Sequence, residues 1–256
     1  MPASSPFLPY LNAAMIEQAY RSSAGNEIDS GKITSPESSA ALVANAFGLF
    51  LDRPHDLPPL PGTEGLGWPA VSVKLEACLR FPWRGGRHPW LDVLIETSTH
   101  LIGVESKRFE PYRSGERVPM SDAYWRPVWG HRMSPVEAVR DALRDGSAEL
   151  DALDATQLVK HMFGLRSESN RREPAKPTVL VYLHAAPDHW PDGKVIDAKA
   201  RSRHAVALER FALKVAGAEV DFCHLTYKRL LANWSRSPSA EVKQHANEVE
   251  RRFSPL

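Results

Sequence analysis

Three charged residues, Asp92, Glu105 and Lys107, stand in a short segment whose pattern predicts two strands joined by a turn. If the turn is centred just after Ser98, antiparallel partners have residue numbers that sum to 197, as 92 and 105 do. Directly opposed residues in an antiparallel pair have Cβ atoms about 4.5–5.5 Å apart. Asp92 and Glu105 would then be close enough to bind one small cation together.

The same register assigns a face to every residue of the hairpin. Lys107 shares a face with Glu105, because side chains alternate along a strand. The turn lacks the Asn-Gly or Asp-Gly signature of a two-residue hairpin, and an odd-length loop would put the two acids on opposite faces. We therefore expect an even loop, with an apolar reverse face: Val93, Ile95, Ile102 and Val104.

Glu76 is a further candidate for the same site. It lies on the polar side of residues 71–81, which alternate as a half-buried strand does. A symmetric return of the chain through Gly86 would place Arg80, rather than Glu76, opposite Asp92. A catalytic role for Glu76 is therefore left open by the sequence.

Gln157 is a second further candidate, near the start of a predicted helix that Asp154 would cap. Its side chain either contributes to the site or is the glutamine partner in a capping box. Lys160, His161 and Gly164 follow on the same polar side of the helix. His184 and His189 lack a metal-ligand pattern, and we expect structural roles for both.

Basic and aromatic residues gather around the hairpin, although the formal net charge of the 256 residues is only +1. The arginines are either a local surface for a polyanion or an ordinary solvated surface. The aromatic side chains either stack on unpaired bases or fill the core. The residues concerned are Arg80, Arg84, Arg87, Arg108, Arg113, Arg117, Arg126 and Arg132, with Tyr112, Tyr124, Trp125 and Trp129.

The whole chain has an ordinary globular composition, with 43% hydrophobic residues. Cys78 and Cys223 fall in strand-like runs, which favours reduced thiols over a disulfide framework. The start has no signal-peptide pattern, and no apolar run is long enough to cross a bilayer. We expect a cytoplasmic protein with no membrane association.

The order of the predicted elements indicates a single α/β domain with a mixed sheet flanked by helices. Residues 1–34 form an N-terminal arm, partly helical or loop. Residues 35–256 form the domain and end in a C-terminal helix. Their predicted elements are a helix at 35–51, strands at 71–81 and 89–107, helices from 134 and 154, a strand at 177–185, a helix at 202–216 and a strand at 220–225.

This arrangement resembles the restriction-endonuclease-like PD-(D/E)xK nuclease superfamily, and in particular its uncharacterised bacterial branch. The resemblance rests on Asp92 in Leu-Asp-Val-Leu, on Glu105-Ser-Lys107, and on the strand order, with Pro89 three positions before the aspartate and Glu110 close behind. It implies a metal-dependent nuclease that hydrolyses phosphodiester bonds of nucleic acid, with DNA as the expected polymer.

In that family Mg²⁺, which Mn²⁺ can replace, would be bound by Asp92 and Glu105, and Lys107 would orient the attacking water. Mg²⁺ prefers oxygen ligands and retains several waters. The resemblance also implies that Glu76, Gln157, Glu110 and Lys160 are candidates to join the site. It gives no sequence specificity, strandedness or oligomeric state.

Two other functions are compatible with the sequence. The first is a catalytically silent nuclease fold that binds nucleic acid or protein. The second is a metalloenzyme that acts on a smaller phosphate ester. The chain has no Gly-Lys-Ser/Thr phosphate loop and no Gly-x-Gly-x-x-Gly turn, which argues against nucleotide-triphosphate or dinucleotide use.

Overall fold

The computed structural model describes residues 5–113 and 118–256, and its strands form one five-stranded sheet in the order β1-β2-β3-β4-β5. β1, β2 and β3 are antiparallel neighbours, whereas β4 runs parallel to β3 and β5 parallel to β4. The expected α/β class with a mixed sheet is confirmed. The strands are β1 (Ala70–Cys78), β2 (Trp90–Thr97), β3 (Leu101–Lys107), β4 (Thr178–His184) and β5 (Val220–Thr226).

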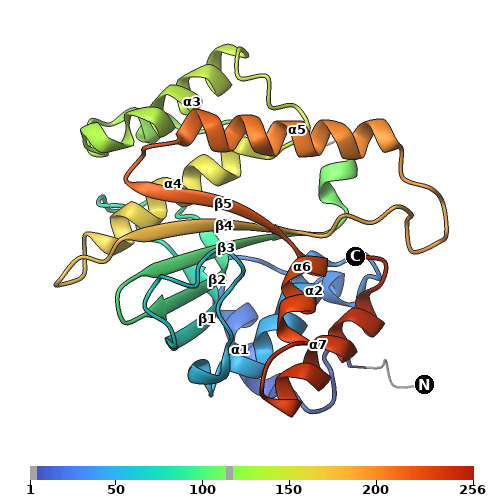
Figure 1. The fold of residues 1–256 in the computed structure, drawn as a ribbon. Coiled ribbons are helices and arrows are strands. Elements are labelled where there is room, and N and C mark those ends of the chain that lie inside the picture. The colour runs from blue at the N-terminus through green and yellow to red at the C-terminus, as the bar shows by residue number, and fades with distance from the viewer. Residues whose placement is uncertain (1–4, 114–117) are drawn as a thin grey trace.

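Helices cover both faces of the sheet (Figure 1). One face carries α1 (Ala13–Ser22), α2 (Ser39–Phe47), α6 (Tyr227–Trp234) and α7 (Ala240–Phe253). The other carries α3 (Ser134–Asp145), α4 (Ala155–Ser169) and α5 (Ala198–Val215). The three-layer arrangement leaves the two ends of the strands as the places where side chains from both layers can meet.

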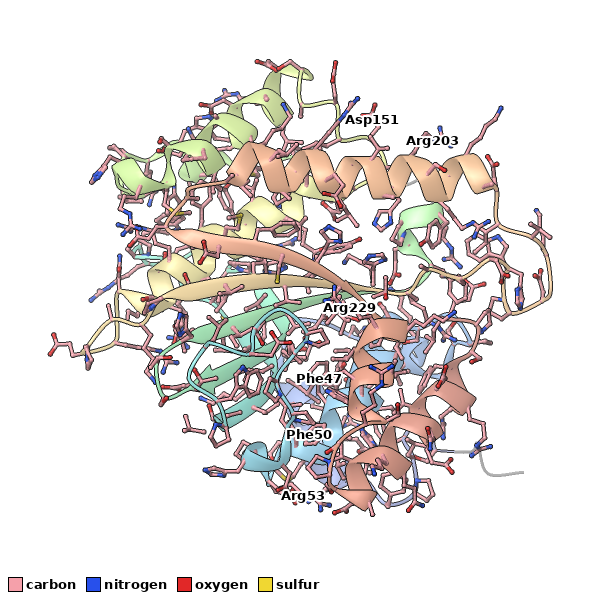
Figure 2. The ribbon with its side chains drawn as sticks, viewed as in Figure 1. Phe47, Phe50, Arg53, Asp151, Arg203 and Arg229 are labelled. Atoms are coloured by element: carbon pink, nitrogen blue, oxygen red, sulfur yellow. The ribbon has the colours of Figure 1, made fainter. Side chains whose placement is uncertain are left out.

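The core on the α2 and α7 face is aromatic. Phe47 and Phe50 lie on the α2 side of the sheet (Figure 2). Both meet the indole of Trp234 edge to face, with ring centroids 5.6 and 5.3 Å apart. Edge-to-face pairs of this kind add to the energy of apolar burial. The described part of the N-terminal arm joins this core, since Phe7, Leu8, Leu11, Ile16 and Tyr20 are all buried in it.

The predicted register of the β2–β3 hairpin is confirmed over residues 93–96 and 101–104, but the paired ladder stops short of Asp92 and Glu105. Val93 pairs with Val104 and Ile95 with Ile102, and all four side chains are fully buried on one face. The turn is even, with Thr97 opposite His100 across a 3.0 Å backbone hydrogen bond. Apolar pairing thus specifies the register, although the turn lacks the residues that favour a two-residue hairpin.

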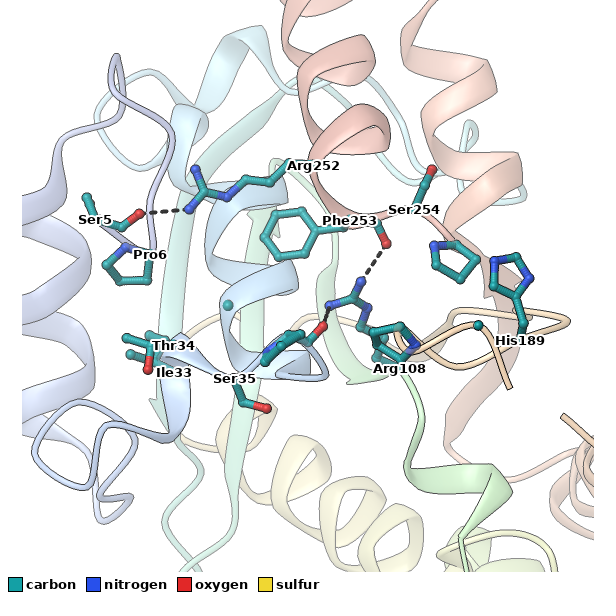
Figure 3. Close-up of a pocket in the computed structure, with 15 residues that line it drawn as sticks. Ser5, Pro6, Ile33, Thr34, Ser35, Arg108, His189, Arg252, Phe253 and Ser254 are labelled. Carbon is teal, nitrogen blue, oxygen red and sulfur yellow. Dashed lines mark hydrogen bonds between the residues drawn. The ribbon is translucent and has the colours of Figure 1, made fainter. Parts of the chain in front are cut away.

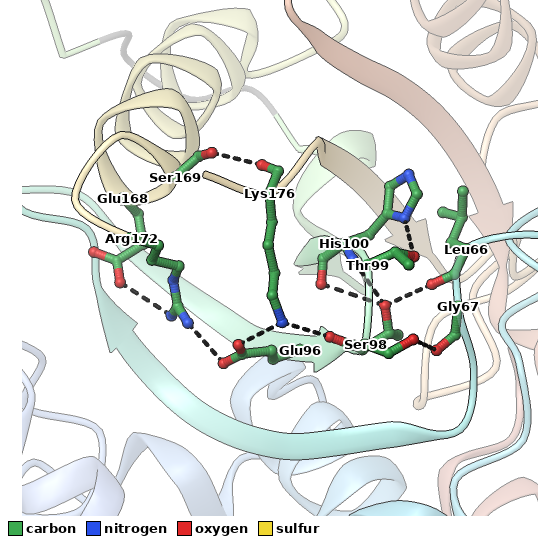
Figure 4. A network of polar contacts seen from close by, with 11 residues as sticks. Leu66, Gly67, Glu96, Ser98, Thr99, His100, Glu168, Ser169, Arg172 and Lys176 are labelled. Atoms are coloured by element: carbon green, nitrogen blue, oxygen red, sulfur yellow. Dashed lines mark hydrogen bonds and ion pairs between the residues drawn. The ribbon is translucent and has the colours of Figure 1, made fainter. Parts of the chain in front are cut away.

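Side chains outside the hairpin hold its turn in place (Figure 4). Lys176 donates to Glu96 at 2.8 Å and to the carbonyl of Thr97 at 2.7 Å, and Arg172 donates to Glu96 at 2.7 Å. Ser98 donates to the carbonyl of Gly67 at 2.8 Å. These bonds tie the turn to the start of β4 and to the segment before β1.

The β1–β2 register differs from the symmetric return through Gly86. Leu75 pairs with Val93 and Ala77 with Leu91, which puts Glu76, and not Arg80, opposite Asp92. The amide of Leu79 bonds to the carbonyl of Pro89, so the loop is centred two residues earlier than expected. Gly85 and Gly86 both have positive φ, and this bends the second half of the loop only.

Several local expectations are corrected. The helix predicted at 35–51 begins later, as α2 at Ser39 with Ser38 as its cap, whereas α3 begins at Ser134 as predicted. Of the two alternatives for the aromatic residues, core packing holds for Tyr124 and Trp129, which are both buried. Both thiols, Cys78 and Cys223, are free, as expected. Within the described ranges, no helix is long and apolar enough to cross a membrane.

Candidate active site

The two acids opposed across β1 and β2, Glu76 and Asp92, line one pocket of about 570 Å³. Gln157, from the first turn of α4, lines it too. Asp92 is held by the strand beside it, because its Oδ2 accepts a 2.6 Å hydrogen bond from the amide of Ser106. Two strands and a helix therefore position the polar groups of this pocket.

Glu105 lies behind this pocket and is almost completely buried, with 1% of its surface exposed. Its Oε1 accepts a 2.5 Å hydrogen bond from Nζ of Lys107. Its Oε2 lies 2.8 Å from Nε2 of His161, but the two groups are not aligned as a hydrogen bond. That contact is electrostatic, so both carboxylate oxygens face positively charged or polar nitrogen.

Lys107 connects Glu105 to the pocket. Its Nζ donates a second hydrogen bond, of 2.8 Å, to Oε1 of Gln157. The main-chain amide of Gln157 bonds to Asp154, as expected for a helix cap, but its side chain does not close a capping box. The side chain is used instead to hold the ammonium group of Lys107.

Two glycines allow α4 to approach the sheet closely enough for these contacts. A Cβ at Gly103 of β3 would lie 2.9 Å from Cδ1 of Leu165 of α4. A Cβ at Gly164 of α4 would lie 2.8 Å from Cβ of Leu79. Close packing at these points sets the distance between α4 and the sheet. It therefore also sets the distance from Gln157 and His161 to β3.

Burial and mutual repulsion control the protonation of the carboxylates. Burial raises the pKa of Asp92 well above its usual value, and the nearby Glu105 raises it further. Burial also raises the pKa of Glu76 to about 7. Burial alone would raise the pKa of Glu105, but Lys107 and His161 outweigh it and lower that pKa to about 2.

Lys107 stays charged in this environment. Burial acts to lower its pKa, but Glu105 and Asp92 together raise it above the ordinary value. Lys107 is thus a permanent cation and Glu105 is strongly ionised. The carboxylates of Asp92 and Glu76 are both stabilised by a proton or by another positive charge. Perturbed acids gathered in a cleft are a common property of functional sites.

Glu76 also carries backbone strain. Its φ of +49° lies in the left-handed region, which residues other than glycine rarely adopt. This conformation typically costs 1–2 kcal/mol for an L-residue, roughly. A half-buried acid in a strained conformation opposite another acid is not explained by stability, and such strain concentrates at functional sites.

The donor set can be compared with the needs of a metal ion. Among residues 5–113 and 118–256, no group of three or more His, Cys, Asp or Glu side chains converges as a preformed metal cage. Mg²⁺ does not need one, because it is commonly bound by one or two carboxylates, with waters and substrate phosphate completing its shell. Asp92 and Glu76 at the pocket fit that requirement, and Glu105 fits it only if it releases Lys107.

The remaining expected residues are divided between the site and other places. Glu110 lines the pocket and accepts a 2.7 Å bond from the amide of Arg108. Lys160 lies over the ring of Tyr124, away from Lys107. Arg113 also lines the pocket and pairs with Glu37. Other predicted basic residues lie elsewhere: Arg126 over Trp83, Arg132 before α3, and Arg117 outside the described residues.

The sequence does not predict the contacts of His161 and of the main-chain amide of Ser106. His161 was placed on the polar side of α4, but its contact with Glu105 was not predicted. Its spacing of one helical turn from Gln157 was the available signal. The amide of Ser106 as a donor to Asp92 had no signal, because a strand residue between two functional side chains gives no sign of its backbone partner.

Comparison with known proteins adds nothing to this geometry, since no family model, curated protein or solved structure matches the chain.

Proposed function

We propose that this protein is a Mg²⁺-dependent nuclease of the restriction-endonuclease-like, PD-(D/E)xK type, which hydrolyses phosphodiester bonds of DNA. The observation that carries the proposal is the set of Asp92 and Glu76 opposed at the pocket with Lys107 and Gln157 beside them. The order of one helix, a three-stranded antiparallel meander, two helices and a parallel strand supports it.

The residues divide the chemical tasks. Bound Mg²⁺ would polarise the scissile phosphate and acidify the attacking water. Asp92 and Glu76 would be its carboxylate ligands, with Glu105 a third if Lys107 moves to the substrate. The ammonium of Lys107, oriented by Gln157, stabilises the negative charge that grows on the phosphate. His161 would then remain as the partner of Glu105.

The test is degradation of DNA by the purified protein in Mg²⁺, in Mn²⁺ and in chelator. Asp92→Asn keeps an oxygen that can accept the bond from Ser106 but removes the charge. The matched control is Asp221→Asn, which makes the same change at an exposed position of β5. We expect cleavage in wild type and the control, and a loss of at least about a hundredfold in Asp92→Asn. Equal cleavage by Asp92→Asn and Asp221→Asn would contradict the proposal.

A second candidate is a silent nuclease fold that binds nucleic acid without cutting it. The observation that favours it is the burial of Glu105 between Lys107 and His161, where neither oxygen is open to a ligand. It predicts DNA binding that chelator leaves unchanged and no cleavage in any divalent cation. The cleavage experiment therefore separates the two candidates directly.

A further inference from the structure

A second pocket, of about 640 Å³, lies beside the candidate active site (Figure 3). It is formed where the N-terminal segment, the chain after β3 and the C-terminal end of α7 come together. Two arginines, Arg108 and Arg252, line it, and the described residues of its wall include no aspartate or glutamate. Acids predominate in the wall of the candidate active-site pocket, which contains Lys32 and Arg113 beside Glu27, Glu37, Glu76, Asp92 and Glu110.

The guanidinium of Arg108 is buried in this wall, with 3% of the residue exposed. It donates to the carbonyl of Pro36 at 2.5 Å and to the carbonyl of Phe253 at 2.6 Å. Its Nε is buried and has no acceptor among the described residues. Burial lowers the pKa of Arg108 to about 10 and outweighs the nearby Glu110, which acts to raise it.

Arg252 stands across the pocket. It donates only to main-chain carbonyls, at 2.7 Å to Ser5 and at 3.4 Å to Phe7. Within the described part of the chain, neither guanidinium forms an ion pair with a carboxylate. The pocket is therefore lined by two arginines and by no described acid, and the Nε of Arg108 is a buried donor with no acceptor among the described residues.

We propose that this pocket binds a phosphate group, held by the guanidinium groups of Arg108 and Arg252. Arginine forks match the oxygens of phosphate, and the burial of Arg108 strengthens its interaction, whereas Arg252 is exposed. Ser35 lines both this pocket and the carboxylate pocket. On the proposed nuclease function, the phosphate belongs to the same nucleic-acid strand, next to the one that is cut.

Titration with inorganic phosphate at constant ionic strength, in chelator, tests the pocket without reference to catalysis. Binding is followed by calorimetry and by the rise in Tm. Arg252→Gln removes a pocket charge, and Arg251→Gln removes a neighbouring charge whose side chain is 73% exposed and outside the pocket. We expect saturable binding by wild type and Arg251→Gln, and a Kd at least about tenfold weaker in Arg252→Gln.

Arg108→Lys is the second variant, because it keeps the charge but loses the planar fork. If it folds, its Kd for phosphate weakens too. The pocket proposal is overturned if wild type gives no saturable binding, or if Arg252→Gln and Arg251→Gln bind phosphate equally. Neither outcome depends on whether the protein cuts DNA.

A labelled single-stranded oligodeoxynucleotide, measured by fluorescence anisotropy in chelator, tests the source of the phosphate. We expect Arg252→Gln to weaken its binding and inorganic phosphate to compete with it. If the oligonucleotide binds equally well to Arg252→Gln while inorganic phosphate does not, the assignment to a strand is overturned and free phosphate is the ligand. Failure of DNA cleavage with intact phosphate binding would overturn the nuclease proposal alone.

Discussion

Glu76 lies directly opposite Asp92 across β1 and β2, and both carboxylates line the same pocket. Two acids in this position repel each other and lose hydration, and burial raises the pKa of both. The arrangement costs stability in the absence of a cation. That cost is the physical basis of the first prediction.

Glu76→Gln should stabilise the protein at pH 8. The folded-state pKa of Glu76 is about 7, above the usual 4.5. The stability that the folded state gains from protonated Glu76 is therefore fully present below pH 4.5 and is lost as pH rises through 7. We expect the variant to gain about 1–3 kcal/mol at pH 8 in chelator, and nothing at pH 4. The measurement is urea unfolding at both pH values.

Glu149→Gln is the control, because Glu149 also has a positive φ, of 53°, but its side chain is 74% exposed. It should change stability little at either pH. A loss of stability in Glu76→Gln at pH 8 would show that the acid has a structural role.

Removal of the ammonium group from Lys107 should destabilise the protein strongly. Lys107→Met leaves the buried carboxylate of Glu105 without its closest positive partner. Breaking a buried pair from one side costs about 3–5 kcal/mol. The double variant Lys107→Met/Glu105→Gln removes both charges and should recover most of that loss in chemical unfolding. If the two changes are simply additive, the pair is not coupled as described.

Gly164→Ala should push α4 away from the sheet. The new Cβ would meet Cβ of Leu79 at 2.8 Å, which the packed core cannot accommodate without a shift. We expect a loss of about 1–3 kcal/mol, and weaker cleavage because Gln157 and His161 move from their partners. Gly65→Ala, at a position with nothing within 4 Å, is the control for the glycine change itself. Equal Tm values for the two variants would contradict this role of Gly164.

Stability should rise with pH between about 3 and 6.5 because of a buried histidine cluster on β4 and α5, where His184 pairs with Lys107 across β3 and β4. Burial lowers the pKa of His204 to about 3 and that of His184 to about 4. The folded state therefore favours neutral imidazoles, and this stability is lost as pH falls below 6.5. His204→Gln keeps a partner for Tyr182, 3.0 Å away, and should flatten the pH dependence of Tm.

His55→Gln, at an exposed position, should leave the pH dependence of Tm unchanged. A slope in His204→Gln as steep as in wild type would mean that other groups cause the acid sensitivity.

The hairpin register was predictable because apolar residues alone require it. A slip of one position would expose Val93 and Ile95, which are fully buried. The loop between β1 and β2 was not predictable in the same way, because Gly85 and Gly86 bend only one half of it. An assumed symmetric return therefore gave Asp92 the wrong partner, Arg80 instead of Glu76.

The contacts of α4 depended on tertiary packing. The sequence predicted Asp154 as its cap and Gln157 as a candidate, but the capping-box alternative used the same pattern. Only the close approach at Gly103 and Gly164 directs Gln157 to Lys107 and His161 to Glu105. The second pocket could not be predicted from the sequence either, because Arg108 and Arg252, which line it, are far apart in the chain.

The most direct test of the central claim is a crystal of the protein soaked in Mn²⁺, measured for anomalous scattering. We expect a peak at coordinating distance from the carboxylates of Asp92 and of Glu76 or Glu105, and its loss in Asp92→Asn crystals. No peak at these carboxylates in wild type, or an unchanged peak in Asp92→Asn, would contradict it.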